Sequence, residues 1–246
     1  MTNGTFFIGW DVGGWNCDKN GKSRDAIVIL DDQRRLVGEP WRGNLRNQIN
    51  SATTTAAWIS ALFGLCSATS AEDGMHCILA IDTPLGFSEA FVRLVNERQW
   101  AGPIGDSHDN PYLFRETERY LFRHGLRPLS PVKDMIGSQA TKGMHVLARF
   151  APKVQRCGVW SDGGAVTAIE AYPSACKTSG LIAELRQNYA PLGHEDKEDA
   201  LTCALVAYLF VCEPQLLKWP HQGVPSSEGW VWVPGDVLAD SGTRKV

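Results

Sequence analysis

The chain has 246 residues, of which 43% are hydrophobic, so it can bury a substantial core. Its 24 Lys and Arg against 27 Asp and Glu give a net charge of −3, which excludes a global positive field that would draw it to nucleic acid or membrane. No apolar run is long enough to span a bilayer, so we expect no membrane association. Seven scattered cysteines without a CxxC pair favour a reducing, cytoplasmic location.

The first part of the chain predicts an antiparallel meander followed by a helix. Three apolar runs separated by turn residues are expected as strands, over 6–10, 26–30 and 36–41. A helix is predicted over 50–66, where apolar residues recur at helical spacing, with Ser51 as its N-cap. The sequence therefore opens with three strands that turn back on one another before the first helix.

The rest of the chain predicts a return to parallel strands. The apolar run 77–82 suits a strand buried on both faces, which should pair parallel with the first strand because a helix precedes it. Breaks at proline divide the mostly helical stretch that follows, so we expect a helical insertion over about 87–160. A late strand over 166–170, an apolar helix over 196–212 and a short edge strand over 230–234 complete the core.

These elements together predict one α/β domain over 1–246. We expect a mixed sheet, composed of an antiparallel meander plus parallel strands, flanked by helices and carrying the helical insertion. The polar tail from Asp240 is expected to be frayed.

Acidic side chains stand where the buried strands end. Asp11 closes the first strand, Asp82 the strand after the first helix, and Glu170 the late strand. Because parallel neighbours bring their carboxyl ends to one edge of a sheet, we expect these three acids to lie close together. Asp196 and Asp199 lie three residues apart on one face near the start of the last helix, and they could complete the cluster.

A gathering of carboxylates points to a divalent cation. Carboxylates forced together raise one another's pKa values unless a cation neutralises them, and ligands that are all oxygen favour Mg²⁺ or Mn²⁺. Any single aspartate could instead be a turn or cap former, and Asp196 could be an ordinary first-turn acid. The set predicts hydrolysis of a phosphodiester by two ions roughly 4 Å apart, with Asp11, Asp82, Glu170 and Asp199 as ligands and Asp196 as a possible fifth.

The chain resembles a known family at several short motifs, which span most of its length. The motifs are GWDVG at 9–13, AIDTPLG at 80–86, the stretch 115–125, EAYP at 170–173, DALTCA at 199–204 and EGW at 228–230. They resemble the predicted nucleases of ribonuclease H-like fold grouped as domain of unknown function 429. The order of elements is also similar to the ribonuclease H-like superfamily, and Asp196-x-x-Asp199-Ala resembles the last-helix signature of its Holliday-junction resolvases. The resemblance implies an acid-cluster nuclease and names no substrate.

Basic residues in the middle of the chain are candidates for substrate contact. Arginine recurs every four residues at Arg115, Arg119, Arg123 and Arg127. Such a stripe on a helix could follow phosphates, with Arg115 and Arg119 as substrate contacts, and Arg115 or Lys142 could hold the flanking phosphate. The competing interpretation is that Glu116 and Glu118 pair with these arginines on a solvated face.

Two other functions are compatible with the sequence. The Gly13-Gly14 turn after the first strand resembles the phosphate loop of the sugar kinase and actin class, which would make the chain a phosphotransferase, although only one such loop occurs here. The chain could also be a non-catalytic scaffold that binds nucleic acid or a partner protein. We expect nucleic acid, either DNA or RNA, as the partner, and the sequence leaves the oligomeric state open.

Overall fold

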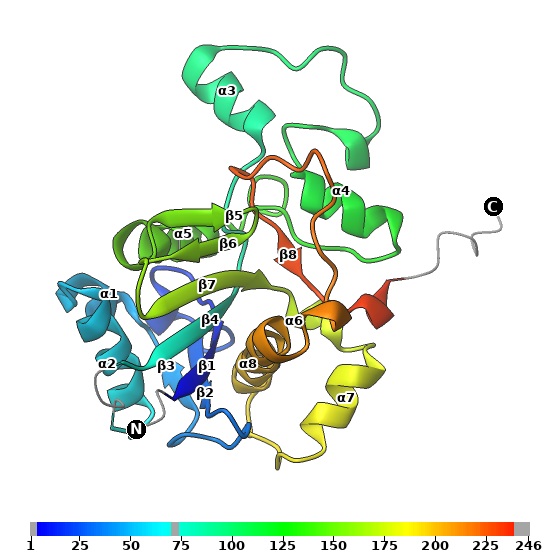
Figure 1. Cartoon of the computed structure of the whole chain (residues 1–246). Helices are drawn as coiled ribbons and strands as arrows, with labels where there is room; N and C mark the ends of the chain where they lie inside the picture. The colour runs from blue at the N-terminus through cyan, green and yellow to red at the C-terminus, as the bar shows by residue number, and fades with distance from the viewer. Residues whose placement is uncertain (1–3, 70–73, 239–246) are drawn as a thin grey trace.

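One mixed sheet forms the centre of the protein. A computed structural model describes residues 4–69 and 74–238, and its sheet has the strand order β3-β2-β1-β4-β7-β6-β5, with β8 beside β7 (Figure 1). The strands are β1 (Thr5–Asp11), β2 (Asp25–Leu30), β3 (Trp41–Gly43), β4 (His76–Asp82), β5 (Lys153–Arg156), β6 (Val159–Ser161), β7 (Val166–Ala171) and β8 (Val231–Trp232). β1, β4 and β7 run parallel in the middle, while β2, β3, β5 and β6 pair antiparallel on the two sides.

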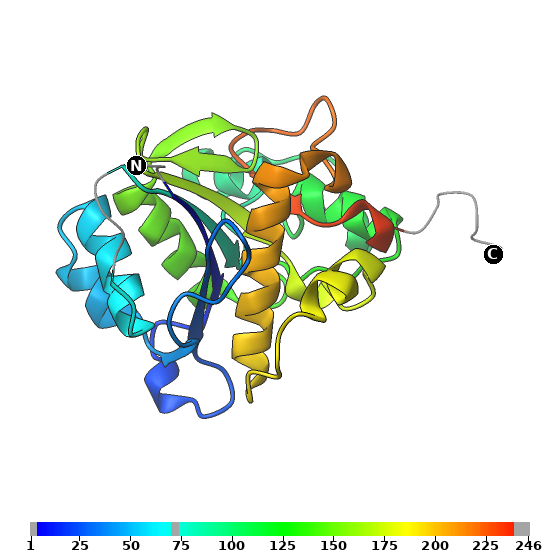
Figure 2. The same ribbon diagram turned by 60° about the horizontal axis from the view of Figure 1, so that its bottom comes forward.

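Helices cover both faces of this sheet. They are α1 (Arg46–Ser51), α2 (Thr55–Leu65), α3 (Glu89–Glu97), α4 (Glu116–Arg123), α5 (Gly137–Phe150), α6 (Pro173–Cys176), α7 (Gly180–Arg186) and α8 (Glu195–Cys212). Buried residues of α7 and α8 share one core with the sheet, and those of α1, α2 and α5 share another, so the two groups lie on opposite faces (Figure 2). In the described residues no helix has the length and apolar character needed to cross a membrane.

The packing of α8 against β1 depends on one glycine. A Cβ placed on Gly9 would lie 1.9 Å from the carbonyl oxygen of Ala200 and 2.4 Å from the backbone nitrogen of Ala204. The helix can approach the strand this closely because Gly9 has no side chain and both helix residues facing it are alanines. The start of α8 is consequently held beside the carboxyl end of β1.

Most of the expected core elements are confirmed, and two local predictions are wrong. The mixed sheet flanked by helices is present, and β1 pairs antiparallel with β2 and parallel with β4, as expected. The third strand lies at Trp41–Gly43 instead of 36–41, so the two ranges share only Trp41, and Leu36 forms an isolated bridge to Leu30. The first long helix is capped by Thr54, whose side chain accepts from the Ala57 N–H, whereas Ser51 ends the preceding helix α1. An extra turn of helix therefore occupies the place where the cap was predicted.

The expected helical insertion over 87–160 is only partly helical and only partly an insertion. α3 and α4 stand beyond the sheet, as Figure 1 shows, but α5 packs into the core with its buried residues Val146, Leu147 and Phe150. The last part of the stretch forms the β5–β6 hairpin, which extends the sheet. The apolar stripe on α5 explains the difference, because a helix with such a face must bury it against the sheet. The tail from Asp240 lies outside the described residues.

Replacing Gly9 tests the contact between α8 and β1. Gly9→Ala should destabilise the protein by about 3 kcal/mol or more, at the upper end of overpacking costs, because the new methyl group meets helix backbone instead of a flexible side chain. Gly21→Ala is the matched control, since a Cβ there has nothing within 4 Å. Chemical denaturation measures both variants, and equal stability of the two would contradict the close packing described here.

Candidate functional site

Two aspartates meet at the carboxyl ends of the central parallel strands. Asp11 and Asp82 are register partners on β1 and β4. Side chains alternate along a strand, so Asp11 projects on the same face as Gly9, which is the face that α8 covers. Asp199 lies in the second turn of α8. It precedes Ala200, whose backbone contacts Gly9, so it lies near the carboxyl end of β1. Asp82 and Asp199 thus lie near enough to Asp11 for their charges to act on it.

These three carboxylates have neither a hydrogen-bond donor nor an ion-pair partner among the described residues, 4–69 and 74–238. Asp11 and Asp82 line a cavity of about 190 Å³, and Asp199 lines a separate one of about 520 Å³ between α6, α7 and α8. Partly buried acids without donors are unusual in proteins, because burial without a partner costs free energy.

Burial, with repulsion from neighbouring acids, raises the pKa of all three groups. Burial, followed by the charge of Asp82, raises the pKa of Asp11 well above its usual range. Burial raises the pKa of Asp82 to about 8, and the charges of Asp199 and Glu170 add to the effect. The pKa of Asp199 is also raised, mainly by burial, although Lys177 opposes the shift. Each carboxylate therefore favours a proton or another cation beside it.

The arrangement is not a finished metal cage. Among the described residues no group of three or more His, Cys, Asp or Glu side chains is placed so that it could already hold a metal ion. The donor chemistry nevertheless fits a hard divalent cation, because Asp11, Asp82 and Asp199 offer only oxygen and repel one another. Binding would require these side chains to turn towards a common point.

Glu170 lies at the same edge of the sheet but has a different environment. Its register partner on β4 is Ile81 and not Asp82, so its side chain leaves the sheet on the opposite face from the two aspartates. Both of its oxygens accept from the Arg115 guanidinium, at 2.6 and 2.8 Å, and one also accepts from the Leu85 N–H at 2.9 Å. Glu170 lines the cavity with Asp11 and Asp82, but it is already neutralised there.

Arg115 is a buried structural cation, which corrects the expectation that it contacts substrate. Only 1% of it is exposed, and its guanidinium also binds Glu118 and the carbonyl oxygen of Glu228. Burial is the largest influence on the pKa of Glu118 and raises it, against the effect of Arg115. The pairing of Glu118 with Arg115 agrees with the competing interpretation of the arginine repeat, but the pair is buried and not on a solvated face. Arg115 thus joins two buried acids from α4 and β7.

Glu116 accounts for two more of the repeated arginines. It pairs with Arg119 at 2.9 Å and with Arg123 at 2.6 Å on the surface of α4. Arg119, a candidate for substrate contact, keeps a side chain that is 26% exposed, so it remains within reach of solvent. The arginine repeat is therefore divided between a buried part and a surface part.

Asp196, like Glu170, is paired with an arginine. Its carboxylate accepts from the Arg42 guanidinium at 2.7 Å and from the Arg24 N–H at 2.9 Å, and only 6% of the residue is exposed. These donors come from the loop after β1 and from β3, so Asp196 fastens the start of α8 to that part of the sheet. It lies beside the three unpaired aspartates without sharing their lack of partners.

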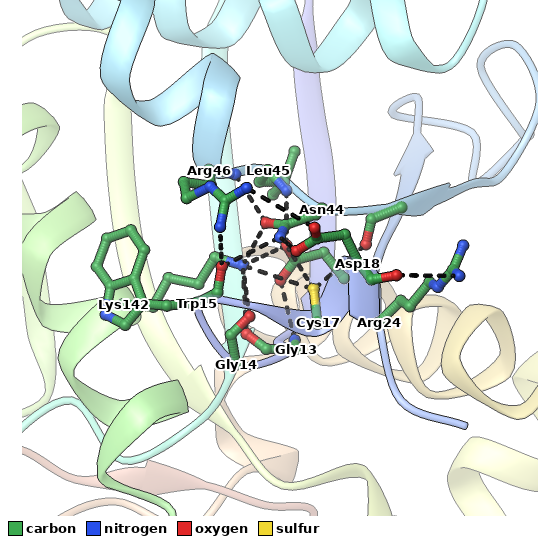
Figure 3. A network of polar contacts seen from close by, with 12 residues as sticks. Gly13, Gly14, Trp15, Cys17, Asp18, Arg24, Asn44, Leu45, Arg46 and Lys142 are labelled. Carbon is green, nitrogen blue, oxygen red and sulfur yellow. Dashed lines mark hydrogen bonds and ion pairs between the residues drawn. The ribbon is translucent and has the colours of Figure 1, made fainter. Parts of the chain in front are cut away.

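Lys142 is fully buried, which corrects its expected role in holding a flanking phosphate. It pairs with Asp25, and its ammonium also donates to the carbonyl oxygens of Gly13 and Gly14, at 3.3 Å each (Figure 3). The Gly13 N–H donates to Asp25 at 2.9 Å. The turn after Asp11 is consequently held by a buried ion pair, and one of the N–H groups that a phosphate loop would use is already occupied.

Sequence reasoning missed Asp25, although a signal was present. An acid opens the apolar run DAIVIL at Asp25–Leu30, and this position is fully buried. A charged residue at the buried start of a strand needs a partner of opposite charge. That partner, Lys142, follows 117 positions later, so no local pattern connects the two.

Comparisons with known proteins identify no relative of this chain, since no family model, curated protein or solved structure matches it. The fold and site define an α/β protein with unpaired aspartates at the carboxyl edge of its central parallel strands.

The raised pKa of Asp82 predicts a dependence of stability on pH. Folding raises this pKa from its ordinary 3.8 to about 8, so the folded protein keeps a proton that the unfolded chain has lost. In EDTA, stability should therefore fall as the pH rises from about 4 to 8. Asp82→Asn should raise Tm at pH 8 by a few degrees, since about 1 kcal/mol moves Tm by roughly 2–4 °C at this size, and should change it little at pH 5. An equal gain at both pH values would refute this.

Removing the buried guanidinium should be far more costly than removing a surface one. Arg115→Met leaves Glu118 and Glu170 buried without their cation, which should cost about 3–5 kcal/mol. Arg123→Met removes an exposed arginine from the same helix and should cost less than about 1 kcal/mol. Urea denaturation of both variants gives the comparison, and similar losses would show that the Arg115 network contributes little.

Proposed function

We propose that this chain is a divalent-metal-dependent nuclease of ribonuclease H-like fold. The observation that carries the proposal is the group of three unpaired carboxylates, Asp11, Asp82 and Asp199, at the carboxyl ends of β1 and β4 and beside the start of α8. A cation that draws them together would remove the repulsion that raises their pKa values. Mg²⁺ or Mn²⁺ suits three carboxylates, and two ions remain part of the proposal.

The chain's other residues have supporting roles in this mechanism. When bound, the metal would supply a Lewis acid and an activated water for displacement at a phosphodiester. Arg115 fixes Glu170 as a rigid wall of the cavity, since both of its carboxylate oxygens accept from the guanidinium. Arg42 holds Asp196 near the three ligands through one of its carboxylate oxygens. Glu170 and Asp196 therefore act as positioning groups, and the ligand set becomes smaller than the five acids that the sequence suggested.

The order of the elements also supports the proposal. The chain has an antiparallel meander, a parallel strand after a helix, a late parallel strand and a final helix, which is compatible with the fold that the ribonuclease H-like resemblance implies. The phosphotransferase alternative is less supported, because the Gly13 N–H binds Asp25 and the Trp15 N–H donates to Ser138. A non-catalytic scaffold is the main rival, and metal dependence distinguishes it.

Cleavage assays test the proposed function. Labelled DNA and RNA of several shapes should be cut by the wild type with Mn²⁺ or Mg²⁺ and left intact with EDTA. Asp11→Asn, Asp82→Asn and Asp199→Asn should each abolish cleavage and the thermal stabilisation by Mn²⁺, because each removes an unpaired ligand. Asp32→Asn, which changes an exposed aspartate in a turn, is the matched control. No cleavage and no stabilisation by Mn²⁺ in the wild type would favour the scaffold.

A further inference from the structure

A basic cavity adjoins the acidic one. It measures about 650 Å³, and Pro128 and Leu129 line both cavities, so they form a shared wall. The charged side chains that line it are the cations Arg119, Arg123, Arg127 and Lys133 and the acids Asp109 and Asp134. The chain has a net charge of −3, so a cavity with four basic side chains is locally more positive than the chain as a whole.

The cations of this cavity are not fully neutralised. Glu116 serves two arginines at once, Arg119 and Arg123. The Nε of Arg119 is buried and has no acceptor in the described part of the chain. Arg127 is exposed and forms no ion pair there, although its carbonyl oxygen accepts from the Tyr172 hydroxyl. Positive charge and an unused donor therefore remain available to an anion.

Lys133 adds a further weakly held cation. Its ammonium is 3.8 Å from Asp134, and its side chain is 45% exposed. An exposed pair at this distance gains little from the contact, so Lys133 can turn to a stronger partner. A phosphate at the mouth of the cavity would provide one.

Arg119 also links the basic cavity to an aromatic side chain. It lines a third cavity, of about 240 Å³, together with Arg93 and Trp100. Trp100 is 71% exposed, so the indole is available for stacking. Cations combined with an exposed aromatic ring are the means by which proteins bind single-stranded nucleic acid.

We infer that the cavity lined by Arg119, Arg123, Arg127 and Lys133 binds a backbone phosphate of a single-stranded nucleic acid. This inference rests on the proposed function, since the reacting phosphate of the same strand would lie in the neighbouring acidic cavity. A strand whose neighbouring phosphate is held by the adjacent cations gains binding that a free phosphate in the acidic cavity lacks. The substrate class is therefore an oligonucleotide that reaches both cavities, and not a free mononucleotide.

Binding measured without cleavage tests the inference. Fluorescence anisotropy in EDTA would compare labelled single-stranded DNA, single-stranded RNA and duplex DNA with the wild type and with Arg127→Glu/Lys133→Glu. The double variant should bind the single strands at least about tenfold more weakly, and each lost phosphate contact should lower the slope of log K against log salt by about 0.7. Arg127→Lys/Lys133→Arg keeps the charges and should bind like the wild type.

Lys153→Glu is the matched control, because it also reverses an exposed charge. Lys153 begins the edge strand β5 and pairs with Ser161, away from the carboxyl ends of β1 and β4. Its binding should stay within about twofold of the wild type, as expected for a charge outside the phosphate path. Equal binding by wild type and double variant, or equal binding of duplex and single strands, would overturn the inference, as would no binding by the wild type. Binding that depends on Arg127 and Lys133 without any cleavage in Mn²⁺ would uphold it and refute the nuclease proposal.

Discussion

The close approach of α8 to β1 is the constraint on which the candidate site depends. A helix normally stands about 10 Å from a sheet because side chains separate them, but at Gly9 helix backbone and strand meet almost directly. The approach requires Gly9 on the strand and alanines at 200 and 204 on the helix. It sets the depth at which the first turns of α8 reach the carboxyl ends of β1 and β4, and so whether Asp199 can join Asp11 and Asp82.

Around this contact the protein treats its buried acids in two ways. Asp25, Glu118, Glu170 and Asp196 each receive a cation from a distant or neighbouring element, namely Lys142, Arg115 or Arg42. Asp11, Asp82 and Asp199 form no ion pair among the described residues, and only the more distant charge of Lys177 acts on Asp82 and Asp199. The first group holds loops and helices in place, while the second raises the free energy of the folded state at neutral pH. The three acids without an ion pair lie at the carboxyl edge of the central strands. Binding of a cation there could offset the free energy that their burial costs.

The sequence predicted the centre of the fold better than its periphery. β1, β4, β7 and α8 were identifiable because long apolar runs leave few alternatives, and the acids at their ends followed directly. The third strand was misplaced because its three residues carry almost no pattern. Arg115 and Lys142 looked like phosphate ligands because a sequence shows charge but not burial, and their acid partners are fixed only by tertiary packing. Glu170 lies one residue before the end of β7, and its pairing with Ile81 instead of Asp82 turns its side chain to the other face.

The distances along the chain between the three unpaired aspartates also affect how the protein is made. Asp11 and Asp82 can become neighbours once β4 has emerged from the ribosome, but Asp199 arrives only after more than a hundred further residues have been synthesised. Pairings so far apart in sequence form slowly, since the loops between them must close first. Until α8 docks, Gly9 and the strand face around it lack the cover that α8 provides in the folded protein. Before α8 docks, the acidic site therefore lacks Asp199.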